Sequence, residues 1–258
     1  ITGIDLFVPV INFVEGKPGN SLAGNQRSRF PANIWWYQSC MSHGCSGVGP
    51  ILDGTGETGW PTYAIDADAT RHRAMEWLSF TYDVQGELYF DVTFAYFVGD
   101  PWVNQTAFGG TGDGTLFYPG TPARIGGKTE VPVESLRLKG IRDGMEDYEL
   151  LNLAKALGVG DRAKAIAQGV YTKTYQATTT PAALDSARAE LAALILHALG
   201  KEGSGCGTTA CSTDPTSPQT AVSQTGLPSG GCSSWGLQSI WLALPVFAAF
   251  ALRRRRSA

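Results

Sequence analysis

The segment GDGTLFYPG, residues 112–120, is followed by a long stretch in which apolar residues recur at helical spacing. The apolar run 115–118 predicts a short strand, entered through the tight turn that Gly-Asp-Gly favours. Residues 133–157 predict a helix, since apolar side chains recur every three or four positions, at Leu138, Ile141, Met145, Tyr148 and Leu151. A strand followed directly by a helix is the repeating unit of a parallel α/β fold.

The same alternation runs back towards the start of the chain. Residues 4–10, 33–37 and 87–92 predict three earlier strands, and residues 68–82 predict a helix. We therefore predict an α/β fold, either a doubly wound sheet or a barrel. Four strands cannot close an eight-stranded barrel, so residues 1–155 are interpreted as the C-terminal half of a (β/α)8-like (TIM-type) barrel.

Two further helices are predicted at residues 161–171 and 181–199, within a helical extension over residues 156–200 that we expect to pack on the barrel. Thr180 is a good N-cap for the second of these helices. Pro181 suits its first helical position, because the missing N–H of proline is unpaired there in any case.

The end of the chain has a different composition. Residues 201–234 are rich in Gly, Ser, Thr and Pro, which predicts a disordered, flexible linker. Residues 235–252, WGLQSIWLALPVFAAFAL, carry no charge and are followed by four arginines at 253–256. At about 1.5 Å per residue this stretch spans roughly 27 Å, which predicts a single C-terminal transmembrane helix rather than a buried core helix. The arginines would stay on the cytoplasmic side, so residues 235–258 are interpreted as a membrane anchor.

Charge and cysteines narrow the class of protein further. The formal net charge is −3, and lysines and arginines are scattered along the chain until its last residues. The sequence therefore shows no basic face, and we expect no nucleic-acid partner. Cys40, His43 and Cys45 would supply three metal ligands where a structural zinc site needs four. We favour an oxidising, exported context, and interpret the chain as a fragment without its N-terminal part. The close cysteine pairs are then predicted disulfides, Cys40 with Cys45 and Cys206 with Cys211, which leaves Cys232 over.

Aromatic residues stand at the ends of the predicted strands. In a β/α barrel the carboxyl ends of the strands carry the active site. Aromatic rings with carboxylates and amides nearby provide an apolar platform and hydrogen-bonding groups, which suits a sugar. A single ring is more often a core filler, but several at successive strand ends predict a glycan site: Trp35, Trp36, Tyr37, Trp102 and Tyr118.

Several motifs appear in order along the chain: IDLFVP from residue 4, WWY from 35, YAID from 63, GELYF from 86, DPW from 100, GDGTLFYPG from 112 and SLRLKGIRDGMEDYE from 135. Over about residues 1–155 this order resembles the C-terminal half of the catalytic domain of glycoside hydrolase family 123. The end of the chain, with Cys232 before an apolar helix and an arginine run, resembles the C-terminal sorting tails of myxobacterial surface proteins.

The first resemblance implies a barrel that releases terminal β-linked N-acetylgalactosamine with retention, without a metal or organic cofactor. In that family an adjacent Asp-Glu pair acts, the Asp orienting the substrate's own acetamido group and the Glu serving as acid and base. This chain contains no Asp-Glu dipeptide, and Glu146-Asp147 is reversed within the last barrel helix. We therefore expect no catalytic residue here and place the pair upstream.

Sugar-binding residues are predicted on the matched motifs. Tyrosine hydroxyls can bond ring hydroxyls or the acetamide, a tryptophan can stack under the sugar, and carboxylates can accept from hydroxyls. Each Asp also has an alternative role in a turn or cap. The charged helix residues Arg137, Arg142, Asp143, Glu146, Asp147 and Glu149 are expected to form ion pairs along the barrel wall. The predicted pocket consists of Tyr37, Asp66, Asp100, Trp102, Asp113 and Tyr118, with Trp36 as an alternative.

Three functions remain open. The first is a surface-anchored glycoside hydrolase of the β-N-acetylhexosaminidase type, and the second is a noncatalytic glycan-binding or structural surface module. The third is a hydrolase that acts on another sugar, since aromatic residues in a pocket do not specify which hydroxyl is axial. The expected partners are a glycan with a terminal N-acetylhexosamine, the membrane through the C-terminal helix, and the sorting machinery. Cys232 is the expected processing and anchoring position, which accounts for the unpaired thiol.

Overall fold

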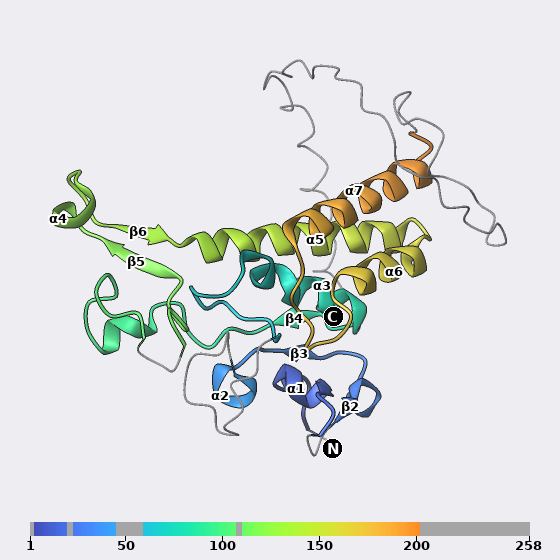
Figure 1. The fold of residues 1–258 in the computed structure, drawn as a ribbon, viewed down its shortest axis with the longest axis horizontal. Helices are drawn as coiled ribbons and strands as arrows, with labels where there is room; N and C mark the ends of the chain where they lie inside the picture. Colours follow the sequence, from blue (N-terminus) through green and yellow to red (C-terminus); the bar gives the residue numbers. More distant parts are fainter. Residues whose placement is uncertain (1–2, 20–22, 45–58, 107–109, 202–258) are drawn as a thin grey trace, which may run out of the picture. The chain divides into compact units, whose positions relative to one another are not determined.

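The computed structural model describes residues 3–19, 23–44, 59–106 and 110–201, all of which belong to one compact unit, Ile1–Cys206. Helices and short strands are mixed along this part of the chain, so the predicted α/β content is confirmed. Figure 1 shows the helices of its C-terminal part lying alongside one another.

Three chain segments lie side by side in parallel. Phe7 and Val10 form bridges to the segment that contains β3 (Trp35–Trp36), and β3 pairs in parallel with β4 (Gly86–Glu87). The amide of Trp35 donates to the carbonyl of Phe7 at 3.0 Å, and that of Leu88 donates to the carbonyl of Trp36 at 2.9 Å. These contacts confirm that three of the predicted strands are parallel neighbours. No closed barrel is formed by the residues that the structure describes, and the half-barrel remains a prediction.

The fourth predicted strand differs from expectation. β5 (Phe117–Gly120) pairs antiparallel with β6 (Val131–Glu134), and the short helix α4 (Pro122–Ile125) lies in the loop between them. The helix expected from residue 133 therefore begins later, at Leu136. The sequence VPVE has two β-branched residues and a proline, which suit an edge strand better than a helical turn.

The other short elements lie in the first third of the chain. β1 (Glu15–Gly16) pairs antiparallel with β2 (Gly24–Asn25). Three small helices accompany them: α1 (Ile11–Val14), the 3-10 turn η1 (Arg27–Arg29) and α2 (Cys40–His43). A further 3-10 turn, η3 (Phe94–Phe97), follows β4.

The long helices agree closely with the sequence pattern. η2 (Ala69–Arg73) and α3 (Ala74–Thr81) occupy the predicted helix 68–82, and all eight residues of α3 are buried. α5 (Leu136–Ala156) is capped by Ser135, whose Oγ accepts from the amide of Leu138. α6 (Gly160–Val170) follows it.

α7 (Pro181–Ala198) begins as predicted, with Thr180 Oγ1 accepting from the amide of Ala183. The core lies between α3 and the last three helices. Figure 1 shows α5, α6 and α7 running alongside one another. Their facing side chains are buried with those of α3, among them Trp77, Leu78, Leu151, Ala163 and Leu191.

One carboxylate holds these helices together. Asp147 on α5 is fully buried and accepts from the indole of Trp77 at 2.8 Å and from Arg73 Nε at 3.1 Å. Its other oxygen lies 2.6 Å from Nε of Arg188 on α7. The predicted ion pairs of α5 thus include one that crosses the core, since Asp147 joins η2, α3, α5 and α7.

None of the helices within the described ranges has both the length and the apolar character to cross a membrane. The predicted anchor helix 235–252 and nearly all of the linker lie outside those ranges, as do Cys45, Cys206, Cys211 and Cys232. The predicted disulfides and the membrane span therefore stay predictions.

Replacing Asp147 with alanine should lower the free energy of unfolding by about 3–5 kcal/mol, because Arg73 and Arg188 lose a shared buried partner. Urea unfolding of the 258-residue chain measures this. Asp143→Ala is the matched control on the same helix, since Asp143 pairs with the exposed Arg142 and should cost under about 1 kcal/mol. Equal losses for the two variants would contradict the central role of Asp147.

Candidate functional site

Arg137, in the first turn of α5, organises the region around the Gly-Asp-Gly turn. Its side chain is buried, and Nη1 donates to the carbonyls of Tyr63 at 2.8 Å and Gly112 at 2.6 Å. Nη2 donates to the carbonyl of Thr115 and, at 3.1 Å, to the hydroxyl of Tyr118. A guanidinium has five donors in a fixed plane. One side chain can therefore join the loop at Tyr63, the turn at residues 112–115 and β5. Arg137 was expected in an ion pair; it binds backbone carbonyls instead.

The Gly-Asp-Gly turn is shaped by close contacts. Gly112 and Gly114 have φ of 76° and 71°, which favour glycine. A Cβ on Gly114 would lie 2.5 Å from the ring of Phe90. Asp113 between them is buried and accepts from the hydroxyl of Tyr89 at 2.9 Å, and that hydroxyl accepts from the amide of Gly114 at 2.6 Å.

The buried position of Asp113 changes its chemistry. Burial raises the pKa of its carboxyl to about 6, opposed by the hydrogen bonds from Tyr89 and Gly114 and by the charge of Arg137. Asp113 was predicted to line a sugar pocket, with a role in the turn as the alternative. In the structure its buried carboxylate is bonded to the hydroxyl of Tyr89, and its contact with a sugar stays a prediction.

A groove of about 400 Å³, here called the Trp102 groove, lies beside β5. The indole Nε1 of Trp102 donates to the carbonyl of Pro119 at 2.9 Å, and its ring lies 4.9 Å from that of Tyr118, centroid to centroid. Asp100 Oδ1 accepts from the amide of Trp102 at 2.9 Å, and Asp100 also pairs with Arg124. The groove therefore has a ring held in place and a charged edge.

The structure brings together some of the predicted sugar-binding residues. Asp100 and Trp102 line the groove, whereas Tyr118 is buried and packs against the ring of Trp102 from beneath the lining. Arg137 connects Tyr118 to the Asp113 turn. Tyr37 is half-buried beside Val10, and Asp66 is exposed in the loop before η2; neither lines the groove.

Trp36, the alternative platform, belongs to the core. It is fully buried, and its indole donates to Ser79 Oγ at 2.9 Å. Side chains alternate along a strand, so Trp36 points to the helices while its neighbour Trp35 is partly exposed. Trp36 therefore cannot stack on a ligand.

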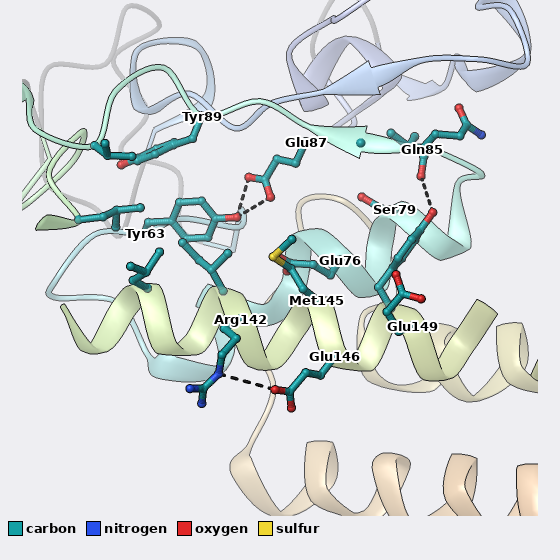
Figure 2. Close-up of a pocket in the computed structure, with 17 residues that line it drawn as sticks. Tyr63, Glu76, Ser79, Gln85, Glu87, Tyr89, Arg142, Met145, Glu146 and Glu149 are labelled. Atoms are coloured by element: carbon teal, nitrogen blue, oxygen red, sulfur yellow. Dashed lines mark hydrogen bonds and ion pairs between the residues drawn. The ribbon is translucent and has the colours of Figure 1, made fainter. Parts of the chain in front are cut away.

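A second hollow of about 610 Å³, here called the acidic pocket, lies between β4, α3 and α5 (Figure 2). Tyr63 and Glu87 face each other at its centre, and the phenol lies 2.6 and 2.7 Å from the two carboxylate oxygens. Burial raises the pKa of the Glu87 carboxyl to about 7, opposed by the hydrogen bond from Tyr63. A carboxyl with this pKa can give or accept a proton near neutral pH.

Glu76 on α3 lies next to this pair. The residue is buried, and neither of its carboxylate oxygens has a hydrogen-bond partner. A Cβ on Gly144 of α5 would lie 2.6 Å from Glu76 Oε2, so a side chain there would displace the carboxyl. Burial, and then the charge of Glu87, raise the pKa of Glu76 well above its ordinary value.

The sequence reasoning missed Glu76, Glu87 and Tyr63 as members of one pocket. Glu76 is the single acid in the apolar run AMEWLSFT, and that signal was available. Glu87 and Tyr63 are 24 positions apart, and their meeting depends on the tertiary fold. Within the described ranges no group of three or more His, Cys, Asp or Glu is arranged to hold a metal ion.

The comparisons with known proteins concern the region of both hollows. The family model described as "Glycoside hydrolase 123, catalytic domain" matches residues 54–154, which include all residues that line the Trp102 groove and the acidic pocket. No curated protein matches the chain.

One similar solved structure comes from the study "The details of glycolipid glycan hydrolysis by the structural analysis of a family 123 glycoside hydrolase from Clostridium perfringens". The identity is 14% and the TM-score is 0.38, too low to carry an argument about the fold. The match covers 76% of this chain and 40% of that one, so the chain spans less than half of the length of that relative.

The raised pKa of Glu87 predicts a pH dependence of stability. A carboxyl whose pKa rises from 4.5 to about 7 on folding stabilises the fold below pH 4.5, and this stability is lost as the pH rises through 7. Glu87→Gln should remove this pH-dependent loss in the free energy of unfolding, which is about 1–2 kcal/mol because Glu87 is partly exposed to solvent. Urea unfolding at pH 5 and pH 8 tests this, with the exposed Glu190→Gln as control. An unchanged difference between the two pH values in Glu87→Gln would contradict it.

Proposed function

We propose that this chain is part of a glycoside hydrolase of the family 123 type that acts on glycans with a terminal β-linked N-acetylhexosamine. The observation that supports this most directly is the match of residues 54–154 to the catalytic domain of that family. The Trp102 groove and the acidic pocket both lie within the matched residues. The proposed chemistry is retaining and substrate-assisted, with the acetamido group of the substrate as nucleophile.

The Trp102 groove has the features of a sugar platform. Sugars present an apolar ring face and a rim of hydroxyls, which an aromatic ring and planar polar groups complement. The ring of Trp102 is held on two sides, by the carbonyl of Pro119 and by the ring of Tyr118. Asp100 and Arg124 at the edge have carboxylate oxygens and guanidinium donors within reach of hydroxyls.

The chain lacks the acidic dipeptide of the proposed mechanism. No Asp-Glu pair occurs among its 258 residues, so in our proposal the pair is supplied by a part of the protein outside this sequence. The alternative is a glycan-binding module without catalysis. The absence of an Asp-Glu pair from these 258 residues supports that alternative too.

We further propose that the protein is displayed at the cell surface. The apolar residues 235–252, followed by four arginines, support a membrane anchor, and residues 201–234 would act as the spacer. Cys232 lies beside the apolar stretch and is the proposed processing position for the sorting machinery.

The hydrolase proposal is tested with an aryl β-N-acetylgalactosaminide and a glycan array, using the full-length protein and the 258-residue chain. Release of sugar by the full-length protein is expected, and binding without turnover by the chain. Trp102→Ala should weaken glycan binding by tenfold or more, because the stacking platform is lost. Phe97→Ala is the control, since Phe97 is 80% exposed nearby but does not line the groove.

Each outcome separates the two functions. Binding without turnover by the full-length protein would favour the noncatalytic module. Absence of both binding and turnover would exclude a glycan function altogether.

The surface proposal is tested with Cys232→Ser in cells. The variant should be released to the medium or keep an unprocessed tail, as judged by fractionation and by the size of the protein on gels. Ser233→Ala, at the next position, is the control and should behave as the wild type. Normal retention and size of Cys232→Ser would refute the role of this cysteine.

A further inference from the structure

The acidic pocket holds more carboxylates than cations. Four of its lining residues are glutamates and one is an arginine, Arg142. Arg142 is already engaged by Asp143 at 2.7 Å and Glu146 at 3.7 Å. In the part of the chain that the structure describes, the pocket's other three glutamates form no ion pair, namely Glu76, Glu87 and Glu149.

Glu76 is the strongest sign of a ligand. A buried carboxylate is strongly unfavourable unless it is paired or hydrogen-bonded, and both of its oxygens lack a partner. Its neighbour on α5 is Gly144, whose missing side chain leaves room for the carboxyl. An apolar residue of similar size would suit this position on stability grounds alone. Residues that stability alone does not explain are concentrated at functional sites.

The rest of the pocket is apolar and aromatic. Leu138, Ile141 and Met145 of α5 line one side, and Figure 2 shows Met145 beside Glu76. The rings of Tyr63 and Tyr89 line the other side in an edge-on pair, with centroids 5.1 Å apart. Carboxylates together with aromatic faces recognise organic cations, while aliphatic walls accept an apolar body.

We propose that the acidic pocket binds an organic ammonium ligand, whose charged nitrogen lies at Glu76 and Glu87 and whose apolar body lies along α5. The volume of about 610 Å³ suits a small molecule. A bare metal ion fits less well, since the described residues contain no metal-ligand cluster. The proposal is independent of the proposed function, because the pocket and the Trp102 groove share no lining residue.

Binding is coupled to protons. Glu87 and Asp147 add negative charge around Glu76, while Arg73, whose positive charge opposes theirs, is held by Asp147. Glu87 itself faces Tyr63. The charged residues of α5 that line the pocket are Arg142, Glu146 and Glu149. Without a ligand, burial favours the protonated forms of Glu76 and Glu87, and an ammonium ion should displace these protons. Affinity should therefore rise between pH 6 and pH 8.

The test uses isothermal titration calorimetry with benzylammonium and with benzyl alcohol, its neutral counterpart of the same shape. Benzylammonium should bind at least tenfold more tightly than the alcohol, bind more tightly at pH 8 than at pH 6, and release protons. Glu76→Gln should reduce its affinity at least tenfold. Glu190→Gln on α7 is exposed and should leave the affinity unchanged.

A second measurement separates a binding role from a structural one. Glu76→Gln should raise the melting temperature at pH 8, because it removes a carboxyl that is easier to ionise in the unfolded chain than in the folded one. Equal affinity for benzyl alcohol, unchanged binding by Glu76→Gln, or a lowered melting temperature would each overturn the proposal. Trp102→Ala should leave benzylammonium binding intact, so a failure of the glycan proposal is distinguishable from a failure of this one.

Discussion

The buried carboxylate of Asp147 is the contact on which the helical half of the structure depends. A charge without water requires partners, and Arg73, Trp77 and Arg188 supply them from three other elements. These partners set the rotation of α5 relative to α3 and α7. Leu151 and Leu191 then lie in the same core. The apolar packing supplies most of the stabilisation, while the partners of Asp147 tie α5 to η2, α3 and α7.

The rotation of α5 also positions both hollows. Ten residues before Asp147, Arg137 binds the carbonyls of Tyr63 and Gly112 and the hydroxyl of Tyr118. Three residues before Asp147, Gly144 makes room for Glu76. The helix α5 therefore contributes to the stability of the core through Asp147, in its middle, and to the geometry of the Gly-Asp-Gly turn through Arg137, at its start. Mutations on its buried face should affect both together.

The two hollows differ in chemistry although they lie in one matched region. At the Trp102 groove the charges are exposed and paired, as in Asp100 with Arg124. In the acidic pocket Glu76 is buried and its carboxylate oxygens have no hydrogen-bond partner. The two proposals follow this difference: a neutral, hydroxyl-rich ligand is proposed at the groove and a cationic one in the pocket.

Local patterns in the sequence determined the helices and three of the strands. The period of apolar residues predicts α5, Thr180 and Pro181 predict the start of α7, and the run around Trp36 predicts a strand, because each depends on neighbours in the chain. Local patterns also placed Asp100, Trp102 and Tyr118 among the candidate residues. The antiparallel pairing of β5 with β6, the burial of Trp36 and Asp113, and the meeting of Tyr63, Glu76 and Glu87 were decided only by the tertiary structure. Burial and long-range pairing depend on which segments pack together, and a carboxylate takes its pKa and its role from that packing.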